Sequence, residues 1–262
     1  MLKNNYIIGN VKIVFSNKII QIFSIVSLLI IGYFASTIDR ESDYFVSISS
    51  TLTYQQFITL CFLPMLFFTD LQIINLYDNN SMLIIRFKNK KRYIKEMIKN
   101  VLCCNNFTFL VLLLTIFTFF NFFGNGDFSV KYIEQYGTTN IIFAFYTIIK
   151  LYILSNMVSI IFTLIIKLTN KLCSTLMFIC ISASLYICQW VSYDVVSSIF
   201  KSPYYFGFYF LSNVKFISFK LNLLSFFIIC LVQFFTIIFL YKLTVKKSRV
   251  VGNWWNMYFY EI

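Results

Sequence analysis

Few residues of this 262-residue chain are suited to acid–base or covalent chemistry. Histidine does not occur, which excludes Ser-His-Asp and Cys-His catalytic sites, a His-ligated haem and a His-containing zinc site. The seven cysteines form no Cys-x-x-Cys pair, and the seven glycines form no GxxxxGK[ST] loop that would cradle nucleotide phosphates. The sequence therefore predicts no enzyme and no metal site, and any ATP-driven work requires a partner that supplies the nucleotide site.

Two ionisable residues, Asp70 and Lys150, stand inside long apolar stretches. Ionisable groups in such stretches are costly and usually face protein or water rather than lipid. The functional interpretation places one or both beside a substrate path. The alternatives, which the sequence leaves open, are a structural pair between the two residues and a lysine whose long side chain reaches water.

The composition predicts a membrane protein, because 59% of the residues are hydrophobic and only 12% are charged, about half the charge of a soluble domain. Apolar runs of the length needed to cross a bilayer lack the alternation of barrel strands, which favours helices. We expect an all-α fold of one domain, residues 1–262, with six transmembrane helices. The expected spans are 19–38, 54–76, 101–123, 140–166, 172–193 and 221–243.

Charge placement orients these spans, since Lys and Arg accumulate on the cytoplasmic side of membrane proteins. With both termini placed inside, the outer segments hold five of the 22 basic residues, Lys150 lies within a span, and the remaining 16 are inner. The five outer ones are Arg40, Lys131, Lys201, Lys215 and Lys220. The orientation of the chain in a membrane thus explains the net charge of +12, and binding to nucleic acid is not needed to explain it.

The segment joining the second and third spans is the most informative one. Residues 78–81 are of helix-capping types, Met82 to Phe87 (MLIIRF) form a short apolar helix pattern, and seven positive charges lie between Arg86 and Lys99. A second apolar set at Ile94, Met97 and Ile98 predicts that this segment continues as a helix into the third span. The charges alone are explained by anchoring to anionic lipid, whereas the aliphatic run ending in Arg-Phe is not.

The run MLIIRF, followed by the basic tract and Tyr93, resembles the cytoplasmic coupling segment of type-2 ABC exporter permeases, particularly small six-span ones of Gram-positive bacteria. The layout of the whole chain is also similar to that family. The resemblance implies that a separate cytoplasmic ABC ATPase, which binds ATP and Mg²⁺, grips a coupling helix here, and that this chain binds no cofactor itself. The contact would fall on Ile84, Ile85, Arg86, Phe87, Arg92 and Tyr93.

The resemblance has three further implications. Residues 3–17 have the pattern of an interfacial helix, which in the family touches the ATPase, although a simple flanking anchor in membrane lipid explains the pattern equally well. Residues 195–218 would form re-entrant outer helices that close the exit, with Pro203, Tyr204, Tyr205 and Phe206 as an outer gate, or else an aromatic belt at the interface. A second permease copy or a paralogue would complete the path as a dimer.

We therefore expect a multi-pass subunit of the bacterial cytoplasmic membrane that exports an amphipathic substrate, such as an antimicrobial or signalling peptide or a lipid-like molecule, by alternating access. One alternative is a membrane immunity or scaffold protein that transports nothing. A second is a secondary transporter driven by an ion gradient, with Asp70 and Lys150 as coupling residues, although the chain has few membrane carboxylates and no inverted repeat.

Overall fold

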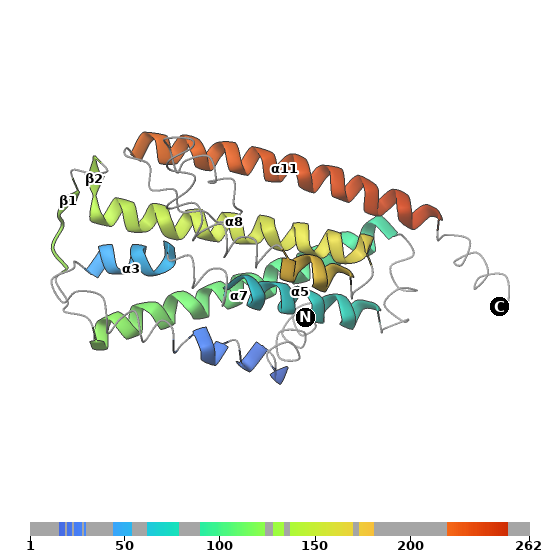
Figure 1. The fold of residues 1–262 in the computed structure, drawn as a ribbon, viewed down its shortest axis with the longest axis horizontal. Helices are drawn as coiled ribbons and strands as arrows, with labels where there is room; N and C mark the ends of the chain where they lie inside the picture. The colour runs from blue at the N-terminus through green and yellow to red at the C-terminus, as the bar shows by residue number, and fades with distance from the viewer. Residues whose placement is uncertain are drawn as a thin grey trace, which may run out of the picture.

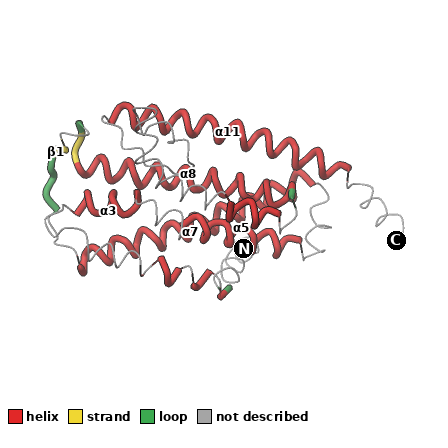
Figure 2. The backbone as a smooth tube through the Cα atoms, in the orientation of Figure 1, coloured by secondary structure: helices red, strands yellow, loops and turns green. Residues whose placement is uncertain are grey.

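The computed structural model describes residues 16–18, 20–22, 24–27, 29, 44–53, 62–78, 90–123, 128–133, 137–169, 173–180 and 219–250. The elements are α3 (Tyr44–Thr53), α5 (Leu63–Asp78), α7 (Lys90–Phe123), β1 (Tyr132–Ile133), β2 (Thr138–Thr139), α8 (Asn140–Leu168) and α11 (Phe219–Val250). The long helices lie side by side along one axis (Figures 1 and 2). The described part of the chain is mostly helical, as expected, apart from two unexpected strands of two residues each.

Three helices are long and apolar enough to cross a membrane: Lys91–Phe122 of α7, all of α8, and Phe226–Lys246 of α11. They correspond to the expected spans 101–123, 140–166 and 221–243, so the chain is a helical, membrane-associated protein. The 34 residues of α7 extend about 51 Å, more than the ~30 Å of hydrocarbon. The prediction that the basic segment continues as a helix into the third span is confirmed, because α7 begins at Lys90.

The other three expected spans are described only in part. Within 19–38 the described residues up to 29 are helical, within 54–76 the structure gives Phe62 and α5, and within 172–193 it gives a helical stretch at 173–180. α5 has 16 residues, or about 24 Å of helix. The count of six spans therefore stays a prediction.

The bundle has two ends, and the long helices run between them in both directions. α7 runs from one end to the other, α8 returns, and α11 runs parallel to α8 (Figure 1). We call the end that holds the start of α7 and the last turns of α5, α8 and α11 the basic end. Its Lys and Arg residues are Lys90, Lys91, Arg92, Lys95, Lys99, Lys167, Lys242, Lys246, Lys247 and Arg249. The opposite end carries β1 and β2, and we call it the hairpin end.

The two short strands β1 and β2 lie between α7 and α8 in the chain, at the hairpin end. β1 and β2 pair antiparallel, and Gly137 adopts a φ of 63°, a left-handed conformation that glycine accepts without a Cβ clash. The buried Asn140, the first residue of α8, donates from Nδ2 to the Ser129 carbonyl at 2.8 Å and accepts at Oδ1 from the Lys131 amide at 3.2 Å. One side chain thus holds the incoming strand against the start of α8.

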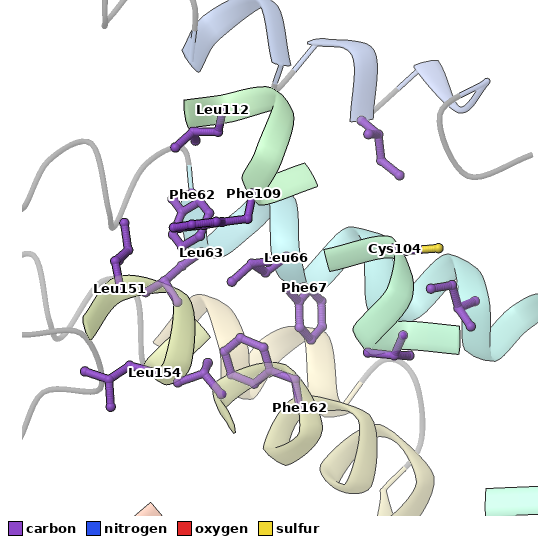
Figure 3. Close-up of a cluster of buried hydrophobic side chains, with 14 of the residues drawn as sticks. Phe62, Leu63, Leu66, Phe67, Cys104, Phe109, Leu112, Leu151, Leu154 and Phe162 are labelled. Carbon is purple, nitrogen blue, oxygen red and sulfur yellow. The ribbon is translucent and has the colours of Figure 1, made fainter. Parts of the chain in front are cut away.

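The apolar core surrounds α8, which packs against α3, α5, α7 and α11. Figure 3 shows side chains of three of these helices meeting, including Phe67 of α5, Phe109 of α7 and Phe162 of α8. The outward surface is also apolar: Leu224, Phe227, Leu231 and Phe235 of α11, among others, are exposed. A helix that is apolar on its outer face suits lipid rather than water.

α3 was not predicted, because residues 44–53 fall between two expected spans. The structure packs this helix inside the bundle, with Tyr44, Ile48 and Leu52 buried one turn apart. The Tyr44 hydroxyl donates to the Phe117 carbonyl of α7 at 3.5 Å, and the Tyr44 ring lies 4.5 Å from that of Phe128. The spacing of four between these apolar residues was the signal that could have revealed a helix here.

Candidate functional site

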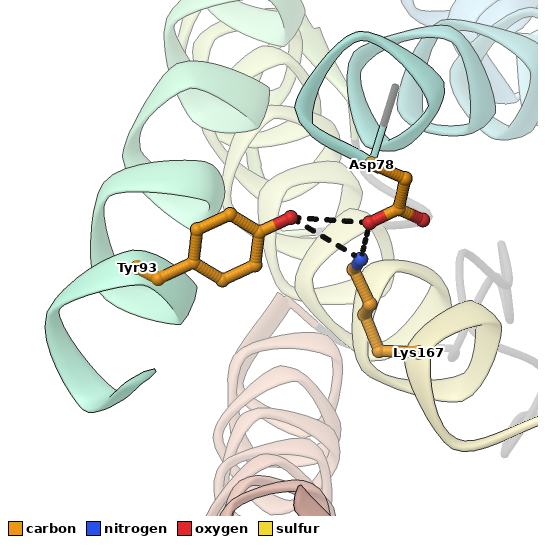
Figure 4. Close-up of polar contacts among 3 residues, drawn as sticks. All are labelled: Asp78, Tyr93 and Lys167. Carbon is orange, nitrogen blue, oxygen red and sulfur yellow. Dashed lines mark hydrogen bonds and ion pairs between the residues drawn. The ribbon is translucent and has the colours of Figure 1, made fainter. Parts of the chain in front are cut away.

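Three residues from three helices meet at the basic end (Figure 4). Asp78 is the last residue of α5, Tyr93 lies in the first turn of α7, and Lys167 lies in the last turn of α8. Lys167 forms an ion pair with Asp78, and the Tyr93 hydroxyl donates to Asp78 Oδ1 at 3.1 Å. The Lys167 Nζ also donates to the Tyr93 hydroxyl at 3.5 Å and stands 5.4 Å from the centre of its ring. We call these residues the basic-end triad.

Helix electrostatics explain why the basic-end triad needs all three members. Lys167 is favourable at the C-terminal end of α8, whose dipole is negative there, whereas Asp78 at the C-terminal end of α5 is not. The cation and the phenol offset that repulsion. The ion pair is partly exposed, with 16% of the Lys167 side chain and 33% of the Asp78 side chain accessible, so it is worth only about 1 kcal/mol or less. Its main effect is to fix the relative positions of three helix ends.

A second set of contacts supports the basic-end triad from inside. The buried Tyr77 accepts a hydrogen bond from Asn100 Nδ2 at its hydroxyl, and the same hydroxyl donates to the Glu96 carbonyl at 3.4 Å. The ring of Tyr77 also meets that of Tyr93 edge to face, with centres 5.6 Å apart. The last turn of α5 is therefore bound to the first three turns of α7.

The six residues expected to contact an ATPase divide into two groups. Ile84, Ile85, Arg86 and Phe87 lie outside the described residues. Arg92 is exposed on α7, while Tyr93 is buried, with 9% of its surface accessible, and its hydroxyl is engaged within the chain. Arg92 is thus accessible at the surface of α7, whereas Tyr93 makes its contacts inside the bundle. The outer-gate residues Pro203, Tyr204, Tyr205 and Phe206 also lie outside the described residues.

A second polar arrangement lies deep in the bundle, around Asp70. This residue of α5 is fully buried, and its Oδ2 accepts a hydrogen bond from the hydroxyl of Ser159 on α8. The Ser159 oxygen in turn accepts from Nδ2 of Asn105 on α7. Ser159 and Asn105 are buried as well. We call Asp70, Asn105 and Ser159 the interior polar cluster; it joins the three helices inside the apolar core.

Lys150 is buried too, with 7% of its surface accessible, but it lies at a different level of α8. Nine residues separate it from Ser159, which corresponds to about 14 Å along the helix axis. The contacts that the structure gives Asp70 are with Ser159 and Asn105. Asp70 and Lys150 are thus both buried in the bundle, but the contacts of Asp70 do not include Lys150.

Sequence reasoning missed several of these residues. Asn105 and Ser159 are polar residues within expected spans, and their polarity was the signal that could have drawn attention to them. Asp78 and Lys167 are separated by 89 residues, and nothing in the sequence pairs them. Chemically, the basic end offers an exposed cationic surface with rigid attachments, and the interior offers a buried carboxyl group with amide and hydroxyl neighbours.

Comparison with known proteins identifies no relative, since no family model, curated protein or solved structure matches this chain.

Proposed function

We propose that this chain is the permease subunit of an ATP-driven exporter of the bacterial cytoplasmic membrane. In this proposal a separate cytoplasmic ABC ATPase binds the segment between α5 and α7 and supplies the energy. Two permease halves, identical or paralogous, form the path for an amphipathic substrate such as a peptide or a lipid-like molecule. The resemblance of residues 82–93 to a coupling segment is the starting point of the proposal.

The observation that carries the proposal is the fixation of both ends of this segment. Asp78, just before it, and Tyr93, just after it, contact each other and Lys167 of α8. A segment that only anchors a loop to anionic lipid needs charge, but it needs no fixed attachment to three helices. A segment that transmits force from an ATPase needs such attachments, because a movement of the segment must become a movement of the helices.

The charge distribution supports the orientation that the proposal requires. The exposed residues Lys91, Arg92, Lys95 and Lys99 of α7 lie at the same end as Lys242 and Lys246 of α11. By the positive-inside rule this basic end belongs in the cytoplasm, where an ATPase would reach it.

The directions of α8 and α11 support the six-span arrangement. Because these helices are parallel, the chain must return from the basic end to the hairpin end between Thr169 and Phe219. The apolar residues 172–193 are long enough for that return. An odd number of crossings between the two helices agrees with an expected fifth span there and with α11 as the sixth.

The mechanism we propose is alternating access. ATP binding closes the ATPase dimer and moves the coupling segments, and the contacts at Asp78, Tyr93 and Lys167 pass that movement to α5, α7 and α8. Because α8 is central to the packing, its displacement would rearrange the interior of each half. The two halves would then open towards the outside and release the substrate.

The test is co-purification of the tagged chain with an ABC ATPase from its native membrane, followed by ATP hydrolysis by the complex. In the proposal, the double substitution Arg86→Glu with Phe87→Ala removes both the charge and the apolar anchor of the contact and reduces ATPase association at least tenfold. The control is Lys246→Glu, which reverses an exposed charge at the basic end on α11 and should leave association unchanged. Undiminished association in the double variant would contradict the proposal.

A further inference from the structure

The interior polar cluster contains two buried oxygens that have no hydrogen-bond donor. Asp70 Oδ1 and Asn105 Oδ1 both lack a partner within the part of the chain that the structure describes. The other polar atom of each side chain is engaged at the same hydroxyl, because Ser159 donates to Asp70 Oδ2 and accepts from Asn105 Nδ2. The two acceptor oxygens are therefore brought to the same level of the bundle by contacts with one residue.

Two threonine hydroxyls flank this level and are likewise buried without a partner among the described residues. Thr108 stands one turn from Asn105 on the same face of α7, and Thr163 stands one turn from Ser159 on the same face of α8. A buried oxygen that makes no hydrogen bond loses free energy relative to water, and the loss is larger within hydrocarbon. The two acceptor oxygens of Asp70 and Asn105, which contacts with Ser159 bring to one level, point to a species that satisfies both of them.

We infer that the interior polar cluster binds a small monovalent cation, either a proton or Na⁺, between Asp70 and Asn105. Both oxygens are hydrogen-bond acceptors, so the species that satisfies them must be a cation or must donate hydrogen bonds. Carboxylate, amide and hydroxyl oxygens are hard ligands that suit H⁺ and Na⁺ rather than soft metals. A divalent ion is a poorer match, because Asp70 supplies a single negative charge here, which would leave half of the ion's charge unbalanced inside the bundle.

The other titratable and charged groups of the surrounding helices are consistent with a bound cation that carries a single positive charge. On α7, the buried thiol of Cys104 interacts electrostatically with Asp70. On α8 the charged residue within the span is Lys150, nine residues from Ser159. α3 carries no charged residue, the charged residues of α11 lie in its first turn and at the basic end, and the described stretch 173–180 carries only the thiols of Cys173 and Cys180.

Occupation of this site would hold α5, α7 and α8 together at mid-bundle. That role does not depend on an ATPase, so the inference is separate from the proposed export function. In this inference the bound cation, rather than Lys150, balances the negative charge of Asp70. Removal of the cation would loosen the three helices at the level of Asp70.

The first test measures thermal unfolding of the purified full chain in lipid nanodiscs at fixed pH, with Na⁺ exchanged for N-methyl-D-glucamine. If Na⁺ is the occupant, Tm rises by roughly 5–10 °C at a hundredfold excess over Kd, and Asp70→Asn abolishes the rise. The matched control is Asp78→Asn, the same change at the basic end, which should keep the rise. A rise that persists in Asp70→Asn would contradict Na⁺ binding here.

A second set of measurements tests whether the bound species is a proton rather than Na⁺. In sodium-free buffer, a proton occupant predicts that Tm rises as the pH is lowered and that this rise is absent in Asp70→Asn. The infrared spectrum of the wild type would also contain the carbonyl band of a protonated carboxylic acid, and Asp70→Asn would lack that band. A wild type without any response to Na⁺ and without that band would overturn the inference.

A pair of serine variants keeps the test informative if Asp70→Asn fails to fold. Ser159→Ala removes the hydroxyl that joins Asp70 to Asn105, whereas Ser155→Ala removes a buried hydroxyl one turn away that bonds the Tyr152 carbonyl of its own helix. We expect Ser159→Ala to weaken the cation response at least tenfold in apparent affinity. Ser155→Ala should retain it, and equal losses in the two variants would overturn the inference.

Discussion

The hydroxyl of Ser159 on α8 donates a hydrogen bond to Oδ2 of Asp70 on α5, although 89 residues separate the two in sequence. Both side chains are buried among the packed helices. A carboxyl group at this depth has a high cost of burial unless hydrogen bonds satisfy it. The contact therefore ties the position of α5 to that of α8 in the same region where Asn105 of α7 reaches the Ser159 oxygen.

The first prediction concerns two adjacent asparagines of α7. Asn105→Ala deletes the buried amide that donates to Ser159, and we expect it to lower the free energy of unfolding by about 1–3 kcal/mol. Asn106→Ala deletes an exposed amide, which accepts from Asn156 at 3.1 Å, and should cost about 0.5 kcal/mol or less. Denaturant unfolding of the two variants in mixed micelles measures the difference. Equal losses of unfolding free energy in the two variants would show that the buried hydrogen bond contributes no more to stability than the exposed one.

The second prediction uses a charge exchange at the basic end. Asp78→Lys and Lys167→Asp, made singly, each place like charges side by side and should destabilise the chain by about 1 kcal/mol or less, with a larger loss at low salt than at high salt. The double exchange restores an opposite pair and should recover most of the loss. A double-mutant cycle measured at two salt concentrations provides the coupling energy. Losses that simply add in the double variant would refute the ion pair.

The third prediction concerns orientation in the membrane. A cysteine placed at Val130, which is exposed at the hairpin end, should react with a membrane-impermeant maleimide added to intact cells. A cysteine placed at Lys95, exposed near the basic end of α7, should react only after permeabilisation. The parent chain with its native cysteines sets the background. The opposite pattern of labelling would place the basic end outside and would remove access for a cytoplasmic partner.

Length and hydropathy were enough to predict the helical class and the positions of α7, α8 and α11, because a run of ~20 apolar residues has one stable conformation in lipid. The continuation of α7 towards the basic segment also followed from the spacing of Ile94, Met97 and Ile98. α3 was missed because a search for long apolar runs passes over a ten-residue helix that contains three serines and two threonines, although its apolar residues are spaced as in a helix.

The candidate site was less predictable than the fold. Asp70 and Lys150 were conspicuous as charges in apolar surroundings, but a sequence does not show which polar residues of other helices will face them. Ser159 and Asn105 meet Asp70 only through the packing of α5, α7 and α8. The same applies to Tyr93, which the resemblance places in contact with an ATPase, and whose hydroxyl contacts Asp78 and Lys167 in the structure.

The central claim is that this membrane chain receives its energy from a nucleotide-hydrolysing partner through the segment between α5 and α7. The most direct measurement is photo-crosslinking in living cells, with a photoreactive amino acid in place of Phe87 and, as the control, in place of Lys246 at the basic end of α11. The account predicts a crosslink from position 87 to an ABC ATPase and none from position 246. Crosslinks from position 87 to lipid alone, in cells where the chain is functional, would contradict it.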